Sequence, residues 1–283
     1  MIDGRPMRRS RRGGPSWAGV PVAVAFAPSA LLFLAFMAVP LAALTWRAFD
    51  SGELASNLTS DFVLDAMKLS ALTSTVSLLL AVLLGTPLAY LLARHNFPGK
   101  MLVDLLVDLP IVLPPTVAGV ALLVTFGRRG VLGGRLEDAG IELAFTTTAV
   151  VLAQLFVSAP YYVRTAKAGF EAVDVQYEGV AATLGASPLR IFWRIILPLC
   201  WPSIVAGSIL CWARGLSELG ATLVFAGNFQ GRTQTMPLAI IGVFDAGRSI
   251  DLAIALAVIL VAAAAVLLLL LRLLTRSAGR NGA

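Results

Sequence analysis

Long apolar runs, separated by short polar segments, occupy most of the 283-residue chain. Each run approaches or exceeds the roughly 20 residues that a helix needs to cross the hydrocarbon core of a bilayer. None alternates in polarity over about ten residues, as the strands of a membrane barrel do. The pattern therefore predicts about six membrane-spanning helices, at residues 20–46, 69–93, 102–126, 145–163, 199–225 and 252–274.

The composition points to the same class. The mean hydropathy is +0.85, 58% of the residues are hydrophobic and only 13% are charged. These values exclude a soluble globular domain of this length. We therefore expect an all-α integral membrane protein.

Charged residues are distributed unevenly between the two sets of loops. An even number of spans places both termini on one side, and the positive-inside rule predicts that this side, with the 177–198 loop, is cytoplasmic. The arginines lie on separate loops without interleaved aromatic residues, so we expect no nucleic-acid partner. The basic residues assigned to the cytoplasmic side are Arg5, Arg8, Arg9, Arg11, Arg12, Arg94, Lys100, Arg164, Lys167, Arg190, Arg194, Arg272, Arg276 and Arg280.

The most distinctive polar insert is residues 177–202 (YEGVAATLGASPLRIFWRIILPLCWP), which lies between two apolar runs. Small residues at Ala181 and Ala182 would let a short helix press closely against a partner, and Gly185 permits a sharp turn out of that helix. Ser187 suits the cap of a second helix. The two helices would form a rigid knob on which a partner protein could dock.

The second helix of this insert begins with Pro188, which suits a first helical position. Its polar side would carry Arg190 and Arg194. An interfacial helix lying on lipid headgroups is the alternative to a docking surface. The predicted apolar stripe consists of Leu189, Ile191, Phe192, Ile195 and Ile196.

The sequence lacks the groups that nucleotide hydrolysis requires. A phosphate cradle ends in Gly-Lys-Ser/Thr, whereas Lys100, the only lysine that follows a glycine, precedes Met101. No nucleophile and base converge, so we expect no enzyme and no cofactor bound by this chain. Transport driven by ATP would therefore need a second subunit to bind the nucleotide.

Other residues with chemical potential have simpler explanations. Asp104 and Asp108 share one helical face near a membrane interface, where charges are solvated. His95, the only histidine, falls in a polar turn and has no cluster of metal ligands around it. On one helix Cys200 and Cys211 would be separated by roughly 16 Å, too far for a disulfide, so we expect them to fill the core.

Three prolines, Pro110, Pro114 and Pro115, interrupt the first half of the third apolar run. They remove backbone donors and force a kink or an unwound segment. One interpretation is a packing kink against a neighbouring helix. In the other, this bend and Thr116 border a transport pathway.

Arg214 and Glu218 lie four residues apart inside the fifth apolar run, within reach of each other. Ionisable groups at membrane depth are costly unless they are paired or hydrated. The pair either fixes helix packing or belongs to a gate or pathway. Hydroxyls, amides and helix N-termini serve a bound anion better than a carboxylate does, so Ser217, Thr222 and Thr116 are the predicted direct contacts.

The 177–198 insert resembles the cytoplasmic EAA loop of permease subunits of ATP-binding-cassette (ABC) importers, because Gly185 is followed ten positions later by Ile195. One departure is that the family glutamate lies six positions before the glycine, where this chain has Gly179, so that Glu178 is one position early. The resemblance implies that the ATPase-docking residues are Glu178, Gly179, Ala181, Ala182, Gly185, Ala186, Ser187, Ile195, Leu197 and Pro198.

A wider resemblance to the molybdate-type permeases of ABC importers extends over residues 69–245. The related sulfate and thiosulfate permeases share the proline segment, whereas residues 217–222 and 232–237 favour molybdate or tungstate. The segments that carry the resemblance are 97–100 (FPGK), 108–115 (DLPIVLPP), 126–130 (FGRRG), 217–222 (SELGAT), 227–228 (GN) and 232–237 (RTQTMP).

The resemblance implies a type I importer permease fold with cytoplasmic coupling helices, in the plasma membrane of a bacterium or archaeon. It implies a homodimer of permease chains, two cytoplasmic ATPase subunits that bind ATP and magnesium, and an external oxyanion-binding protein. A sulfate or thiosulfate permease is the alternative, followed by a secondary transporter, although no clear internal repeat supports the latter. The residues predicted to border the pathway or gate are Pro114, Pro115, Thr116, Arg214, Ser217, Glu218 and Thr222.

The same reasoning divides the chain into four parts. Residues 1–18 form a basic cytoplasmic tail, and residues 19–65 contain the first transmembrane helix and an external loop. Residues 66–274 form the permease core, with the docking loop at about 169–198. Residues 275–283 form a second cytoplasmic tail.

Overall fold

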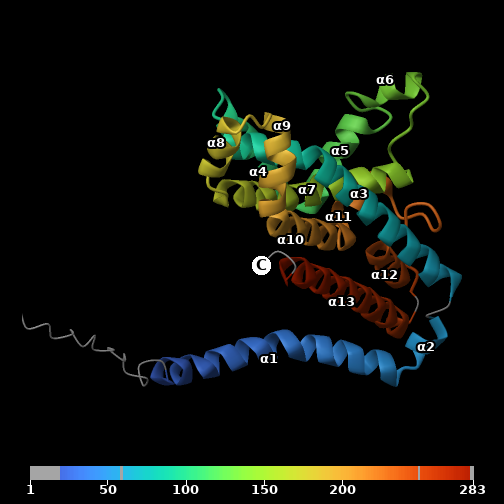
Figure 1. Ribbon diagram of the computed structural model, residues 1–283. Coiled ribbons are helices and arrows are strands. Elements are labelled where there is room, and N and C mark those ends of the chain that lie inside the picture. The colour runs from blue at the N-terminus through green and yellow to red at the C-terminus, as the bar shows by residue number, and fades with distance from the viewer. Residues whose placement is uncertain (1–19, 58–59, 248, 281–283) are drawn as a thin grey trace, which may run out of the picture.

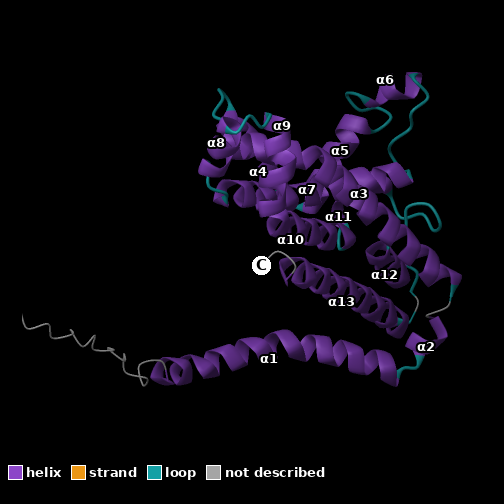
Figure 2. Ribbon diagram, viewed as in Figure 1, coloured by secondary structure: helices purple, strands orange, loops and turns teal. Residues whose placement is uncertain are grey.

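The computed structural model describes residues 20–57, 60–247 and 249–280, and every regular element within them is a helix (Figure 2). The predicted all-α class is confirmed. The helices are α1 (Val20–Asp50), α2 (Glu53–Asn57), α3 (Asp61–Arg94), α4 (Lys100–Val112), α5 (Pro115–Phe126), α6 (Gly133–Asp138), α7 (Thr147–Ala172), α8 (Gln176–Thr183), α9 (Pro188–Ile191), the π-helical segment η1 (Phe192–Ile196), α10 (Leu197–Leu216), α11 (Gly220–Ala226), α12 (Met236–Asp245) and α13 (Ile250–Arg280).

Helix α7 is the centre of the bundle and contacts α3, α4, α5, α10 and α11. Glycines allow the closest of these contacts. A Cβ on Gly85 would lie 3.0 Å from the Tyr162 ring, and one on Gly169 would lie 2.3 Å from the Ser203 Cβ. Small residues therefore bring α3 and α10 against α7, as is common between helices in membranes.

The two cysteines fill this core, as predicted. Both are buried free thiols. Cys200 Sγ donates to the Gly169 carbonyl at 3.3 Å, and Cys211 Sγ donates to Ser158 Oγ at 3.4 Å. They help to hold α10 against α7.

The third apolar run is broken into two helices. The axes of α4 and α5 differ by 118°, with Leu113 and Pro114 in extended conformations between them. Pro115 occupies the first position of α5, and a proline keeps the residue before it out of the helical region. The prediction of one continuous helix at 102–126 is therefore wrong, whereas the predicted break at the prolines is confirmed.

The fifth apolar run starts earlier and ends earlier than predicted. Helical structure is continuous over 29 residues, Pro188–Leu216, because η1 joins α9 to α10. In η1 the Leu197 N–H donates to the Phe192 carbonyl, five residues back. The helix stops at Leu216 and α11 starts at Gly220, so the prediction of a single helix over 199–225 is wrong.

Helix α1 stands apart from the bundle and runs beside α13 (Figure 1). Its contacts are with α13 and with the short helix α2, and Arg47 Nε lies 3.2 Å from an Asp251 carboxylate oxygen. No part of its most apolar window is buried. Residues 26–43 of α1 are thus a largely apolar stretch that the described part of the chain leaves exposed.

By length and composition, three described stretches could cross a membrane: Phe26–Asp50, Asp61–Arg94 and Pro188–Leu216. The bent pair α4 and α5 would make a fourth. The two other predicted runs, 145–163 and 252–274, correspond to α7 and α13. In α13 the apolar helical stretch is shorter, Ile250–Val266.

Candidate functional site

Helices α8 and α9 form a protruding knob, residues 176–191, at one end of α3 and α7 (Figure 1). Gly185 turns the chain out of α8 with a φ of +80°, a backbone conformation that favours glycine. Its N–H donates to the Ala182 carbonyl at 3.0 Å, and the Ala186 N–H donates to the Ala181 carbonyl at 3.1 Å. These two bonds satisfy the last carbonyls of α8, so the turn is well defined.

An ion pair anchors the knob to α3. Arg94, the last residue of α3, places its Nε 2.8 Å from a Glu178 carboxylate oxygen, and its side chain is only 9% exposed. The same guanidinium donates to the Val173 carbonyl at 2.8 Å. Glu178 therefore faces inward and positions α8, and the sequence did not reveal Arg94 as its partner.

Exposed apolar side chains are prominent on the knob, next to exposed polar residues such as Thr183 and Arg190. Leu184 is 82% exposed, and Gly179 has open space beside it. Of the predicted docking residues, Ala182, Gly185, Ser187 and Pro198 are exposed, whereas Ala181 is buried and Ala186, Ile195 and Leu197 are partly buried. The other large exposed apolar side chains here are Val175, Tyr177, Val180 and Leu189.

The second helix follows the prediction in part. Ser187 occupies the cap position of α9, but its hydroxyl makes no capping bond. Ile191 and Ile196 are buried, as the predicted stripe requires. Leu189, which the same predicted stripe includes, is 69% exposed instead.

The two broken spans meet, which brings together two predicted segments that lie far apart in the sequence. A Cβ on Gly220 would lie 2.9 Å from the Pro115 Cβ and 3.2 Å from the Thr116 nitrogen. Further along, a Cβ on Gly119 would lie 2.9 Å from the Ala221 carbonyl oxygen. Helices α5 and α11 therefore start side by side, and we call this meeting point the N-terminal junction.

Arg214 and Glu218 support this junction. Arg214 Nη1 lies 2.9 Å from Glu218 Oε2, and Glu218 Oε1 accepts a hydrogen bond from the Ala221 N–H at 2.8 Å. The Glu218 side chain is 1% exposed and that of Arg214 27% exposed. The carboxylate thus ties the end of α10 to the first turn of α11, which is a positioning role.

The hydroxyls predicted to contact an anion occupy different environments. Thr116 and Ser217 are exposed, and Ser217 Oγ donates to the Arg214 carbonyl at 3.1 Å. Thr222 is fully buried. Pro114 is exposed and Pro115 is partly buried. The exposed hydroxyls of Thr116 and Ser217 are the ones that an anion beside the junction could reach.

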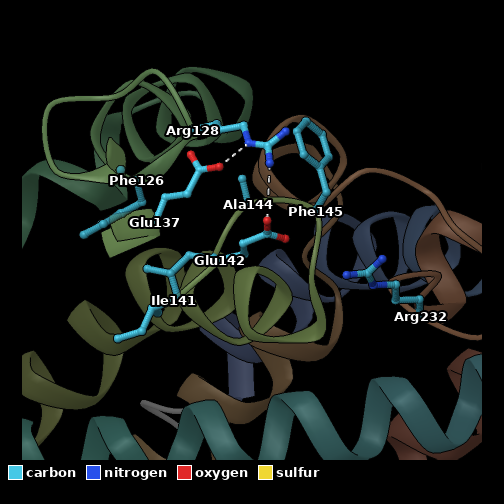
Figure 3. Close-up of a pocket in the computed structure, with 10 residues that line it drawn as sticks. Phe126, Arg128, Glu137, Ile141, Glu142, Ala144, Phe145 and Arg232 are labelled. Atoms are coloured by element: carbon cyan, nitrogen blue, oxygen red, sulfur yellow. Dashed lines mark hydrogen bonds and ion pairs between the residues drawn. The ribbon is translucent and has the colours of Figure 1, made fainter. Parts of the chain in front are cut away.

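At the opposite end of α7 from the knob, residues 127–146 form a lobe that contains α6 (Figure 1). This α6 lobe holds a pocket of about 330 Å³. Arg128 Nε lies 2.7 Å from a Glu137 oxygen, and Arg128 Nη2 lies 3.5 Å from a Glu142 oxygen. Figure 3 shows both carboxylates turned toward Arg128. The hydrogen bond to Glu137 raises the pKa of Arg128 above its ordinary value.

The remaining polar candidates have structural partners or lie in solvent. Lys167 Nζ lies 2.6 Å from an Asp104 oxygen, and Arg164 pairs with Asp108, so both aspartates join α4 to α7. His95 is exposed. Among the described residues, no three metal-ligating side chains cluster in a way that could hold an ion.

A family model, described as the binding-protein-dependent transport system inner membrane component, matches residues 81–280. The chain belongs to this family. The family assignment covers the knob, the junction and the α6 lobe, because all three fall within the matched residues.

Two relatives of this transport-system permease are named for molybdenum. The molybdenum transport system permease protein ModB of Mycobacterium tuberculosis (strain ATCC 25618 / H37Rv) is 44% identical over 249 residues, which cover 87% of this chain and 90% of the relative. The molybdate/tungstate transport system permease protein WtpB of Thermococcus kodakarensis (strain ATCC BAA-918 / JCM 12380 / KOD1) is 43% identical over 202 residues, which cover 71% and 76% of the two chains. The predicted resemblance to molybdate-type permeases is confirmed.

A solved structure shows the same fold. It is a chain from the bacterial alginate ABC transporter in complex with an alginate pentasaccharide-bound periplasmic protein, with a TM-score of 0.74 at 17% sequence identity. The match covers 91% of this permease and 94% of that chain. The predicted importer-permease fold is therefore confirmed, while the roles of the individual residues stay predictions.

Proposed function

We propose that this permease is the membrane-spanning subunit of an ATP-driven importer that carries a tetrahedral oxyanion, molybdate or tungstate, by alternating access. The observation that carries the proposal is the 44% identity, over 87% of this chain, to a relative named a molybdenum permease. ATP and magnesium would bind to a separate ATPase subunit, because the sequence contains no phosphate cradle.

The α8–α9 knob is the proposed seat of that ATPase. Leu184 is 82% exposed, and Tyr177, Val180 and Leu189 are also exposed on the knob; several exposed apolar side chains on one short segment are typical of a protein–protein contact. The Gly185 turn and the Arg94–Glu178 pair hold the knob in one shape. A force applied to the knob would therefore pass to α3 through Arg94, and to α10 through the continuous helix Pro188–Leu216.

The N-terminal junction is the proposed border of the oxyanion pathway. The first N–H groups of a helix have no partner within the helix, and the helix dipole adds positive potential there. At the start of α5, Pro115 has no N–H, so the free donors are the N–H groups of Thr116 and Val117, beside the exposed Thr116 side chain. Neutral donors of this kind can hold a dianion and release it again, which transport requires.

The proposed assembly is a homodimer with both termini in the cytoplasm of a bacterium or archaeon. Residues 26–43 of α1 support a second copy, because this largely apolar stretch lies away from the bundle and is exposed among the described residues. Two knobs would then seat two ATPase subunits. An external oxyanion-binding protein would deliver the substrate on the opposite side.

The decisive test is the ATPase activity of the complex purified through this subunit, in lipid discs, with its cognate binding protein. Stimulation by molybdate- or tungstate-loaded binding protein, but not by sulfate, is expected. Stimulation by sulfate-loaded binding protein would instead identify sulfate as the substrate. Uptake that persists without any ATPase and follows a proton gradient would replace the importer with a secondary transporter.

A further inference from the structure

Within the pocket of the α6 lobe, one cation lacks a carboxylate partner. Arg128 is occupied by Glu137 and Glu142. Arg232, which also lines the pocket, forms no ion pair with any described residue, and its side chain reaches from the 227–235 loop toward the side where Phe145 lies (Figure 3). The pocket therefore offers a second arginine to a carboxylate from outside.

Phe145 forms the adjoining wall in a strained conformation. Its φ is +59°, and it is the sole described non-glycine residue with a positive φ. For a bulky side chain this backbone conformation is strained, and such strain clusters at binding sites. The ring is 46% exposed and packs edge-on against Phe229, with 6.4 Å between the ring centroids.

The pocket is bonded directly to the transmembrane helices. The Phe145 N–H donates to the Phe225 carbonyl of α11 at 3.2 Å. Thr147 Oγ1, in the first turn of α7, donates to the Arg232 carbonyl at 2.8 Å. A partner that presses on Phe145 and Arg232 would therefore act on α11, whose other end lies at the N-terminal junction.

We infer that this pocket receives an acidic side chain of the external oxyanion-binding protein, with Arg232 as its counter-ion and Phe145 as the apolar wall. The inference rests on the proposed function. Glu137 and Glu142 repel any incoming anion, but they repel a singly charged carboxylate less strongly than a dianionic oxyanion. A carboxylate carried on a hydrocarbon stem matches both Arg232 and the apolar lining of Phe126, Ile141 and Phe145.

The test measures the affinity of the purified complex for its cognate binding protein loaded with molybdate, and compares wild-type and variant complexes. Arg232→Glu is expected to weaken binding by at least about tenfold, because it places like charges together. Arg232→Lys keeps the attraction and should stay within about threefold of wild type. Arg135→Ala, on the exposed surface of the same lobe outside the pocket, is the matched control and should bind normally.

Co-elution with the ATPase and basal ATPase activity report whether each variant complex is intact. If Arg232→Glu does not assemble, the neutral Arg232→Gln replaces it, with a loss of about fivefold expected. Wild-type affinity in an assembled Arg232→Glu or Arg232→Gln complex would overturn the inference. So would a loss of response to free molybdate in the absence of binding protein, since that result would assign Arg232 to the transported anion.

The failure of the proposed function has a different signature. In that case the wild-type complex itself would carry no ATPase or would not respond to any loaded binding protein. If the wild type responds and the Arg232 variants respond equally, only the pocket assignment fails.

Discussion

The α8–α9 knob and the α6 lobe occupy opposite ends of α7, and they are built in opposite ways. The knob presents exposed apolar side chains such as Leu184 on a turn whose backbone groups are hydrogen bonded. The α6 lobe presents the charges of Arg128, Glu137 and Glu142, and beside them the strained backbone of Phe145.

This contrast matches two kinds of association. Interfaces that persist are more apolar and resemble a core cut in half, whereas interfaces that open repeatedly are more polar and wetter. The exposed apolar side chains of the knob suit the lasting contact proposed for the ATPase. The charges of the lobe suit the transient contact proposed for the binding protein.

The largest effect is expected from Leu184→Asp. Covering a fully exposed leucine stabilises an interface by about 1.5–3 kcal/mol, and a buried unpaired carboxylate adds a further penalty. Co-purification of the ATPase should fall by roughly a hundredfold. The matched control is Val131→Asp on the α6 lobe, where the valine is 77% exposed and ATPase binding should be unchanged. Loss of the ATPase from Val131→Asp alone would reverse the assignment of the two ends.

A smaller effect is expected from Gly185→Val, which forces a β-branched residue to a φ of +80°. The conformation costs about 1–3 kcal/mol for such a residue, so the knob should populate other shapes and hold less ATPase. Gly185→Asn is the control, since asparagine tolerates this conformation. Quantitative co-purification checks both variants. Equal retention by the two would show that the turn does not shape the docking surface.

The smallest effect is expected from salt. Raising the ionic strength from about 0.05 to 0.5 M shortens the screening length severalfold and should weaken association with the binding protein by several-fold. The ATPase should stay attached, because its proposed contact is apolar. Light scattering or surface capture across a salt series measures both the retention of the ATPase and the binding of the binding protein in one preparation. If the ATPase dissociates at lower salt than the binding protein, the knob does not hold it by apolar contacts.

Local features were predictable from the sequence where one residue type decides the geometry. Gly185 predicted its turn, the prolines around Pro114 predicted the break between α4 and α5, and the four-residue spacing of Arg214 and Glu218 predicted their ion pair. Backbone sterics and helical periodicity act over a few residues, so they can be read without a partner.

Features that depend on distant contacts were not predictable. Arg94 and Glu178 are far apart in the sequence, and only the packing of α3 beside α8 brings them together. The meeting of Pro115 with Gly220 likewise requires both spans to break at the same depth. The strain at Phe145 carries no signal in the sequence, because a phenylalanine there fits an ordinary loop equally well.

The continuous helical stretch Pro188–Leu216 begins in the knob and ends two residues before Glu218. At 1.5 Å per residue, its 29 residues span about 43 Å. For a straight helix of this length, a tilt of about 10° about one end would move the other end by roughly 7.5 Å, which exceeds the rise of one helical turn. A modest rotation of a partner bound to the knob would therefore displace Leu216, next to the buried Glu218, by more than the rise of one helical turn.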